Sequence, residues 1–356
     1  MSKTTTTENL VKKMYISKII KSEKALLKKH NDWKNLTLEE KNKITKENRN
    51  VCKIMKNVYY DWENCDISKF VSDAYYQTII IPKLNPINYG LYGIRHKNSY
   101  FSDKNYQEKF VEDVKFPKTV ARCINHDYYD ANYNYITDSQ FLNLLNKHDK
   151  LVFKKSLGIG HGKGVKLGVK EEYKEIIQSF GSDFIVQEVL EQHKEMAKFN
   201  NSSVNIVRIT SLYWKGNVYI LGSILRVGAP GAFCDHLGYG KTNPRIVALD
   251  ENGALVGPAI DPNDGVVYKD IFGKKVTGII PKYNKLKEIV MRNHSKFAQH
   301  KIIGWDFAVD KNENVVCIEY NSTVPGIIQT QMVCGPVFAQ QTKNKKSILE
   351  EIIKGE

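Results

Sequence analysis

Two short, mostly hydrophobic runs near the end of the chain flank a polar stretch, which is typical of two strands joined by a hairpin. The pattern predicts strands at 303–309 and 315–320, and the residues between them include the turn-forming Asp and Asn. A hairpin brings Asp306 beside Glu319, and Asn321 shares the face of Glu319 because it lies two positions further on. Two carboxylates and an amide oxygen then converge, and Mg²⁺ prefers such oxygen ligands. The alternative is a half-exposed hairpin whose acidic residues face water.

The N-terminal part of the chain has a helical period instead. Residues 10–30 carry an apolar stripe at helical spacing with lysines around it. Thr37 followed by Glu40 is a capping box that predicts the start of a second helix, and a third is predicted at 51–60. We expect a helical, basic N-terminal region, 1–95, that packs on the rest of the chain through its apolar stripe. Lying on a membrane interface is the alternative.

Two segments that follow break this pattern. Two prolines and Gly90 in 75–90 predict an extended linker or an edge strand. Ser102 or Asp103 then predicts the start of a helix that runs to about residue 112, with Lys104 in its first turn. A lysine there is unfavourable for the helix dipole, so a special role and an ordinary surface position both stay open.

A glycine-rich turn joins two predicted strands at 151–155 and 165–169. A strand follows the turn and no Gly-Lys-Ser/Thr occurs, so the segment is neither a P-loop nor G-x-G-x-x-G. Such turns cover nucleotide phosphates in kinase-like lids, because glycine lets backbone N–H groups approach closely. Lys154 would add a positive charge to the same phosphates; a flexible hairpin is the alternative. The glycines are Gly158, Gly160, Gly162 and Gly164.

Arginines are placed unusually in the strands that come next. A strand at 184–190 ends in Gln-Glu-Val-Leu, and Asn205, Arg208 and Arg226 lie on two further strands separated by a Lys-Gly-Asn turn. The chain has only seven arginines among its 53 basic residues. A strand arginine is suited to fork-like binding of carboxylate or phosphate, with a buried structural ion pair as the alternative.

Composition limits the class of protein. A chain of 356 residues, 42% of them hydrophobic, can form two domains or one large domain with a full core. Its six cysteines are scattered with no C-x-x-C pair, which predicts reduced thiols and neither a disulfide framework nor a zinc site. No long apolar run and no signal-peptide pattern occurs. We therefore expect a cytoplasmic protein, with the inner face of the membrane as one place where it could act.

The positive charge is concentrated at one end. The formal net charge is +14, and residues 1–60 contain 15 Lys and Arg against 6 Asp and Glu, which gives +9 of that total. No RNA-binding, zinc-finger or helix-turn-helix signature accompanies it, so no specific nucleic acid is expected as a partner. A lysine-rich solvated surface is the simpler interpretation, and an anionic glycan or membrane surface is the next partner to consider.

These motifs occur in the order found in the ATP-grasp superfamily. The order is Asp-Lys, Lys with a Gly-rich hairpin, Gln-Glu-x-Leu, Asn-x-x-Arg, Leu-Arg-x-Gly, Gly-Trp-Asp and Glu-x-Asn. Within that superfamily the chain resembles the sugar-transfer-associated branch, which is found with polysaccharide biosynthesis enzymes, over about 75–331. The resemblance implies an α+β fold of two lobes that clasp ATP, a small lobe with the lid at 96–190 and a large lobe with the metal site at 191–356, after the helical extension at 1–95.

The resemblance also implies roles for single residues. ATP-grasp enzymes contact nucleotide phosphates through two lysines that correspond to Lys104 and Lys154, and adenine through a hinge after the lid. Arg226 resembles the arginine that stabilises the transferred phosphoryl group, and Arg208 and Asn205 would line the same pocket. The other implied positions are Gln187, Glu188, Val189 and Leu190 at the hinge, His193 or Glu195 at the ribose, and Asp306, Glu319 and Asn321 at Mg²⁺.

Two departures from the family pattern concern the acceptor and the N-terminus. Where the branch is expected to continue with Asp-Asn and Gly-Gly, this chain has Cys234-Asp235-His236 and Gly238-Tyr239-Gly240-Lys241. That region faces the acceptor side, which puts the identity of the acceptor in doubt. The N-terminal helices do not resemble the α/β domain that precedes many ATP-grasp cores.

The activity implied by the resemblance is an ATP- and Mg²⁺-dependent ligation that produces ADP. A carboxylate, from a uronic acid or an amino acid, would become an acyl phosphate, and an amine acceptor would convert it to an amide. A kinase of the same fold that phosphorylates a hydroxyl, and a non-catalytic glycan- or nucleic-acid-binding protein, are the alternatives.

Overall fold

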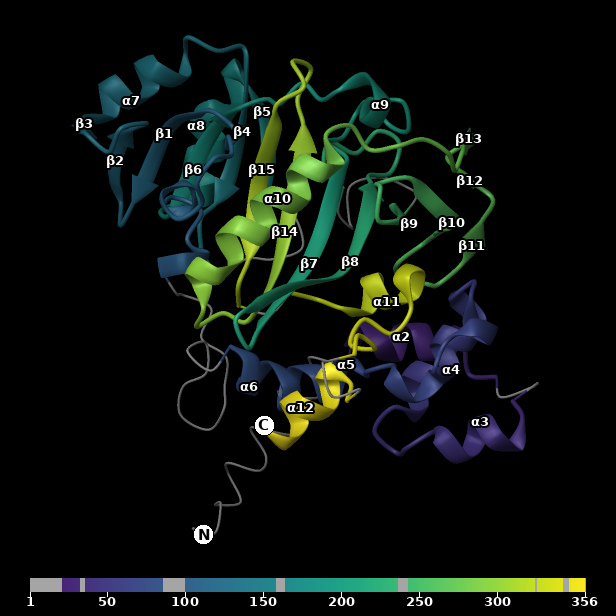
Figure 1. Ribbon diagram of the computed structural model, residues 1–356. Helices are drawn as coiled ribbons and strands as arrows, with labels where there is room; N and C mark the ends of the chain where they lie inside the picture. Colours follow the sequence, from purple (N-terminus) through teal and green to yellow (C-terminus); the bar gives the residue numbers. More distant parts are fainter. Residues whose placement is uncertain are drawn as a thin grey trace.

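The computed structural model describes residues 21–32, 36–85, 100–157, 164–235, 243–323, 325–341 and 346–355. Two antiparallel sheets organise the chain, with helices on their faces (Figure 1). The helices are α2 (Lys21–Lys29), α3 (Leu38–Lys43), α4 (Arg49–Val58), α5 (Asp73–Tyr75), α6 (Ile81–Leu84), α7 (Asp138–Leu145), α8 (Tyr173–Phe180), α9 (Lys194–Ala197), α10 (Tyr283–His294), α11 (Ile328–Cys334) and α12 (Ile348–Lys354). An α+β fold, as expected, is present.

The small sheet has the strand order β3-β2-β1-β6-β4-β5. Its strands are β1 (Thr119–Ile124), β2 (Asp127–Asp130), β3 (Tyr135–Ile136), β4 (Lys150–Lys155), β5 (Val165–Val169) and β6 (Phe184–Glu188). Helices α7 and α8 cover one face through a core that includes Phe141, Phe153, Tyr173 and Phe184. Alternate residues of the strands point to the opposite face, which therefore carries Lys154.

The large sheet has the strand order β11-β10-β9-β8-β7-β14-β15. Its strands are β7 (Ile206–Trp214), β8 (Asn217–Val227), β9 (Arg245–Leu249), β10 (Leu255–Ile260), β11 (Val267–Tyr268), β14 (Ile302–Val309) and β15 (Val315–Asn321), while β12 (Asp270–Ile271) and β13 (Lys274–Lys275) pair separately. Helix α10 packs on one face with Trp305 and Phe307 in the core. Helices α4 and α11 cover part of the other face, over Ile224 and Ile246.

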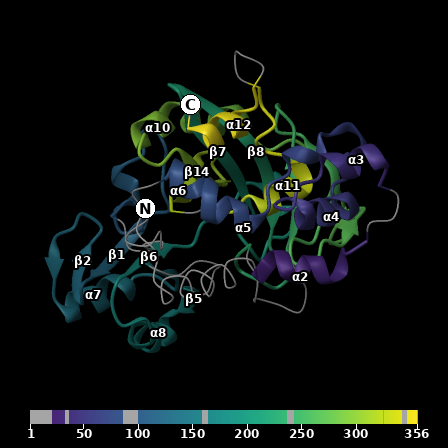
Figure 2. The same cartoon turned by 90° about the horizontal axis from the view of Figure 1, so that it is seen from below.

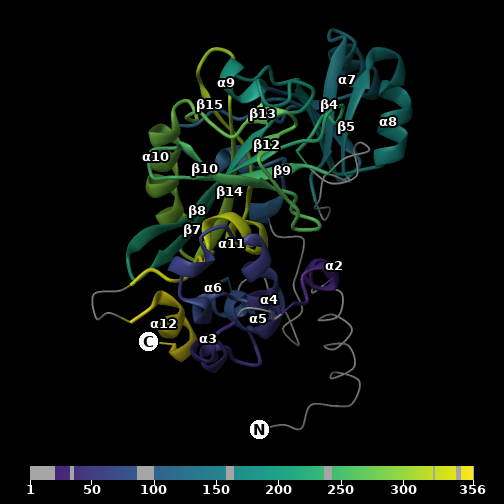
Figure 3. The same cartoon turned by 90° about the vertical axis from the view of Figure 1, so that its right-hand side faces the viewer.

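The N-terminal helices are part of the core, as the apolar stripe predicted. Val51, Ile54 and Met55 of α4 are buried with no exposed surface against the large sheet and α11. Figures 1 and 2 show α2 to α6 gathered with α11 and α12 at one end of the molecule, and Figure 3 shows the same group from the side. The Thr37–Glu40 capping box is present at the start of α3. Residues 10–20 of the first predicted helix lie outside the described residues.

The prediction for 75–90 is wrong where the structure describes it. Residues up to Leu84 are helical, with a π-helical turn at Tyr76–Ile80 before α6. Pro82 lies in the first turn of α6, where no backbone N–H is required, so it does not break the segment. The side chain of Asn85 then bonds the backbone of Ile302 and Ser322, which ties the end of this segment to β14 and β15.

The helix predicted from Ser102 or Asp103 to about 112 is also wrong. Only two short 3₁₀ turns form, at Tyr100–Ser102 and Gln107–Lys109. The backbone N–H of Lys104 donates to Ser156 O (3.1 Å), and the side chain of Asn105 donates to Cys123 O (3.3 Å). Because the backbone N–H of Lys104 bonds Ser156 O and that of Asn105 bonds the Asp103 side chain, neither group contributes to a helical ladder.

All six cysteines are free thiols, in agreement with the prediction of reduced cysteines. No helix in the described parts of the chain combines the length and the apolar character needed to cross a bilayer.

Candidate active site

The predicted hairpin forms, with Asp306 directly opposite Glu319 and Gly304 directly opposite Asn321. The ladder is irregular between Asp306 and Phe307: Phe307 pairs with Cys317, so Ile318 is an extra residue on β15. Such a bulge shifts the alternation of side chains along the strand. Val315, Cys317 and Tyr320 therefore face the core with α10, and Glu319 turns to the other face with Asp306.

Arg208 holds Asp306 from the neighbouring strand. The two residues are register partners on β7 and β14, and both are largely buried. Arg208 Nε donates to one carboxylate oxygen, and Nη2 donates to the other at 2.6 Å. Gly304 leaves room for this fork, because a Cβ there would lie 3.3 Å from Arg208 Nη1. The arginine is a buried ion-pair partner and also lines the site.

Lys104 and Lys154 meet Glu319 from two different segments. Lys104 Nζ lies 3.1 Å from Glu319 Oε2. Burial raises the pKa of Glu319, but Lys104, with Lys154 and Arg208, outweighs burial and lowers that pKa to about 2. Burial lowers the pKa of Lys154 to about 8, although Glu319 opposes this shift. Glu319 is therefore an ionised carboxylate between two bases.

Arg226 meets a carboxylate that the sequence did not identify as a site residue. Arg226 Nε lies 3.0 Å from Asp235 Oδ2, an ion pair outside hydrogen-bond geometry. Burial raises the pKa of Asp235 and Arg226 opposes that rise, while Asp306 and Arg208 are also within electrostatic range. Asp235 stood in the sequence only as part of a departure from the family pattern. Its signal was its place eight residues after the end of β8, which carries Arg226.

The donor set at the hairpin fits a hard divalent cation. Asp306 and Glu319 supply carboxylate oxygens, and the Asn321 amide lies 3.4 Å from both of them. Its nitrogen faces the carboxylates here, and rotation of the amide presents its oxygen instead. In the described residues no three His, Cys, Asp or Glu side chains group as a metal site. Two carboxylates and an amide leave positions for phosphate oxygens, as Mg²⁺ requires.

A family comparison covers most of these residues. The family model described as "Sugar-transfer associated ATP-grasp" matches residues 177–347. This part of the chain is therefore similar to sugar-transfer-associated ATP-grasp domains. The match includes Arg208, Arg226 and the complete hairpin, and it confirms the resemblance inferred from the motifs.

Solved structures similar to this chain are ATP-grasp enzymes of low sequence identity. The D-Ala:D-Ser ligase VanG from Enterococcus faecalis is 14% identical, with a TM-score of 0.44 over 71% of this chain and 61% of that chain. Biotin carboxylase from Campylobacter jejuni is 14% identical, with a TM-score of 0.38 over 68% of this chain and 48% of that chain. N5-carboxyaminoimidazole ribonucleotide synthetase from Thermotoga maritima is 13% identical, with a TM-score of 0.35 over 62% of this chain and 42% of that chain. This chain spans less than two thirds of each of these structures. No curated protein matches it.

The expected adenine hinge of the ATP-grasp domain lies at the end of β6. Gln187 is buried, its amide nitrogen donates to Pro117 O (3.2 Å), and its side-chain oxygen has no partner among the described residues. Glu188 pairs with Lys118 (2.7 Å), and Val189 and Leu190 follow the last strand residue. A buried carbonyl without a donor is suited to an incoming N–H group.

Three other expected positions have contacts of their own. His193 Nδ1 accepts the backbone N–H of Glu195, whose carboxylate pairs with Lys198. Asn205 is fully buried and bonds the backbone of Met196, Asn200 and Gly228. The structure thus gives Asn205 a role in joining loops below the site. In the lid, Gly158, Gly160 and Gly162 lie outside the described residues, and Gly164 accepts the N–H of Lys155 (2.7 Å).

Proposed function

We propose that this chain is an ATP- and Mg²⁺-dependent carboxylate–amine ligase that forms an amide through an acyl phosphate and produces ADP. One observation carries the proposal: the hairpin carboxylates Asp306 and Glu319 meet Lys104 and Arg208 where the small sheet lies beside β15 (Figure 1). With Lys154, Arg226 and Asp235 the cluster has four cations and three anions. Such a mixture suits phosphates held with a divalent cation.

Each group of site residues has a different proposed binding role. Lys104 and Lys154 bind the phosphates of ATP. Of the glycine-rich turn that the family resemblance assigns to the same phosphates, only Gly164 lies within the described residues. The free carbonyl of Gln187 and the backbone of residues 188–190 bind adenine, and His193 or Glu195 binds the ribose. Mg²⁺ held by Asp306, Glu319 and Asn321 supplies neutralisation of the phosphate charge.

The chemistry then runs in two steps. A substrate carboxylate oxygen attacks the γ-phosphorus in line, the bond to the β,γ-bridging oxygen breaks, and ADP leaves. Arg226 and Arg208 donate to the oxygens on which charge collects during this transfer. An amine next attacks the acyl carbon, phosphate leaves, and the amine loses a proton.

The substrate class follows the family. A uronic acid of a glycan, or an amino acid destined for one, is the carboxylate we propose, in the decoration of a cell-surface polysaccharide or its sugar precursor. The six free thiols support a cytoplasmic setting for this reaction. The exposed lysines of α2 leave an anionic glycan or the inner membrane surface as a further contact.

The test is a product assay. The protein is incubated with ATP, Mg²⁺ and pairs of candidate acids and amines. ADP and free phosphate are then measured, and the products are identified by mass spectrometry. We expect ADP, phosphate and an amide in equal amounts, and hydroxylamine should trap the acyl phosphate when the amine is omitted. A phosphorylated hydroxyl without free phosphate would identify a kinase instead, and nucleotide-independent binding of glycan would contradict both activities.

A further inference from the structure

The segment 103–109, here named the strap, connects the two sheets at the candidate site. On one side, the Lys104 N–H and the Asn105 side chain bond the small sheet at Ser156 O and Cys123 O. On the other side, Gln107 Nε2 donates to Tyr320 O of β15 at 2.8 Å. Lys104 reaches Glu319, the neighbour of Tyr320, from this strap. The position of the strap therefore sets where the Lys104 ammonium lies.

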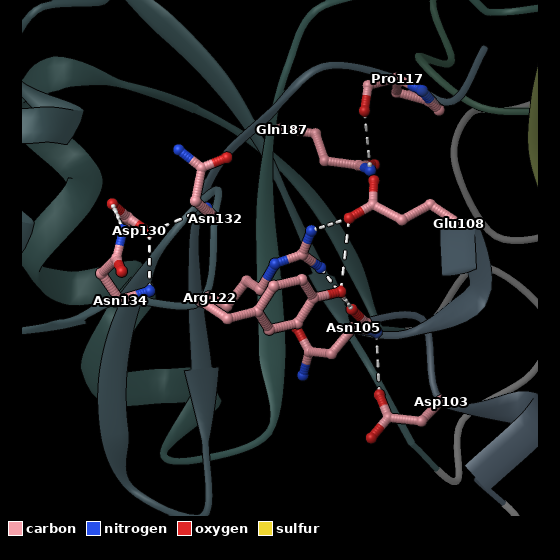
Figure 4. A network of polar contacts seen from close by, with 10 residues as sticks. Asp103, Asn105, Glu108, Pro117, Arg122, Asp130, Asn132, Asn134 and Gln187 are labelled. Atoms are coloured by element: carbon pink, nitrogen blue, oxygen red, sulfur yellow. Dashed lines mark hydrogen bonds and ion pairs between the residues drawn. The ribbon is translucent and has the colours of Figure 1, made fainter.

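Arg122 of β1, in the small sheet, binds the strap through its guanidinium. The residue has no exposed surface, and its guanidinium donates to Asn105 O and to the Glu108 carboxylate (Figure 4). The Tyr133 ring lies 4.2 Å from the guanidinium carbon, and the Tyr133 hydroxyl donates to Asn105 O as well. Two donors thus converge on the carbonyl of the residue next to Lys104.

A buried arginine used in this way is costly for stability alone. Desolvation of a guanidinium is repaid only when its donors are satisfied, and Arg122 Nε has no partner among the described residues. Both donor contacts of Arg122 go to the strap, and neither goes to its own sheet. The arrangement fixes the strap more than it stabilises the small sheet.

We propose that Arg122 is a positioning residue for nucleotide binding: with Glu108 and Tyr133 it fixes the strap so that Lys104 meets the phosphates and Glu319. The inference rests on the proposed function in one respect, since it assigns Lys104 to the nucleotide phosphates. Arg122 shares the face of the small sheet that carries Lys154, because both residues pair with Ile185, but its side-chain donors reach the strap residues Asn105 and Glu108. We therefore assign its effect to the position of Lys104.

The chain contains a matched control in Arg245. This arginine is also buried, pairs with a carboxylate (Asp261, 3.4 Å) and lies 3.7 Å from the centre of a tyrosine ring, Tyr268. Its Nε is unpaired among the described residues, as in Arg122. Because its cross-strand partner is Val227 and not Arg226, it faces away from Arg226 and the site. Arg245 donates only through Nη1, to Asp261 and to two backbone carbonyls of its own segment, Asn243 O and Pro244 O. Arg122→Lys and Arg245→Lys therefore each remove one buried guanidinium, and only the first guanidinium contacts the strap.

The experiment is a double-mutant cycle on affinity for a non-hydrolysable ATP analogue, with the full chain and no acceptor. We expect Arg122→Lys to weaken binding about tenfold and to add almost nothing in a Lys104→Met background. Arg245→Lys should lower the melting temperature comparably, leave the affinity of the otherwise intact chain within about twofold, and combine additively with Lys104→Met. Equal, additive losses from Arg122→Lys and Arg245→Lys would overturn the proposal.

Hydrogen exchange of the strap gives a readout that does not depend on nucleotide. The backbone amide hydrogens of 103–109 should exchange faster in Arg122→Lys than in the unmodified chain, and Arg245→Lys should leave their exchange rates unchanged. Unchanged exchange rates in Arg122→Lys would overturn the proposal. If Arg122→Lys does not fold, Tyr133→Phe takes its place, because it removes one donor to the strap and keeps the ring. We expect the same weakening of analogue binding and the same faster amide exchange, each by a smaller amount. Failure of Lys104→Met to weaken binding while Lys154→Met does so would reject the role of Lys104 but not the proposed function. Absence of any ATP binding by the unmodified chain would reject the proposed function. The exchange rates would still show whether Arg122 fixes the strap.

Discussion

Asp306 and Glu319 are direct cross-strand partners, yet each carboxylate pairs with a different base. Asp306 is held by Arg208 of the same sheet, and Glu319 is held by Lys104 of the strap. Two adjacent carboxylates would repel each other without these cations. This pair of carboxylates is thus stabilised from two parts of the chain, one in the large sheet and one attached to the small sheet.

Glu319→Gln should reduce turnover by orders of magnitude while the fold stays intact, because it removes one charged metal ligand and keeps the shape. ADP production at saturating Mg²⁺ and a thermal melt measure the two effects. Glu313→Gln, at the exposed tip of the same hairpin, is the control and should have normal turnover. Near-normal ADP production by Glu319→Gln would exclude the role given to this carboxylate.

Arg226→Ala should lower kcat far more than it raises the KM for ATP, because the charge to be matched develops during phosphoryl transfer. An arginine of this kind contributes on the order of 10³-fold. Arg226→Lys should restore only part of the rate, since a point charge cannot reproduce the fork. Steady-state kinetics and a thermal melt on both variants measure these effects. If both variants lost stability and ATP affinity together, Arg226 would have a structural role instead, as a buried partner of Asp235.

Affinity for ATP should fall as the pH rises through about 8, because the pKa of Lys154 is lowered to that value by burial. Above it the lysine is neutral in the free protein, so binding of phosphate must take up a proton. Calorimetry in two buffers of different ionisation heat measures this uptake, which should disappear in Lys154→Met. A pH-independent affinity between 7 and 9.5 would contradict the contact with phosphate.

Glu23→Gln should stabilise the protein at pH 8 and have little effect at pH 5. Burial raises the pKa of Glu23 from 4.5 to about 7, although the Asp73 N–H that it accepts opposes the rise. Between these values the folded chain binds more protons than the unfolded chain, so this residue's contribution to stability falls as the pH rises. The difference should be about 2 kcal/mol in free energy of unfolding. Denaturant titrations at both pH values check it, with the exposed Glu47→Gln as control.

Deletion of residues 1–60 should prevent folding, because it removes α2 to α4 and uncovers the apolar face of the large sheet at Ile224 and Ile246. Expression, circular dichroism and a thermal melt measure the result. A charge reversal at the exposed Lys24 and Lys28 leaves the core in place and tests surface attachment separately, through binding to anionic vesicles at low salt. A folded deletion variant that only lost vesicle binding would show that the helices serve a surface.

The hairpin was predictable because two short hydrophobic runs flank an Asp/Asn turn, which determines their pairing locally. The bulge at Ile318 was not, since it depends on Tyr320 packing against the core beneath α10. The helical state of 75–84 was missed because proline was taken as a breaker, whereas packing of Tyr76, Ile80 and Leu84 against C-terminal residues decides the conformation. The strap was missed for a similar reason: its Lys104 N–H and its Asn105 carbonyl bond residues that are distant in sequence, Ser156 and Arg122. The position of Asp235 shortly after β8 is a weak signal, and its contact with Arg226 is what identifies it as a site residue.

One cluster joins Val71, Ile80 and Leu84 to Phe338, Ile348 and Ile352, which lie about three quarters of the chain length further on. During synthesis the first of these residues leave the ribosome long before the last. At 5–20 residues per second, the apolar face of 71–84 waits on the order of 10–50 s for α12. The native arrangement of the N-terminal helices is therefore a late event, and this segment is where we expect a chaperone to engage the nascent chain.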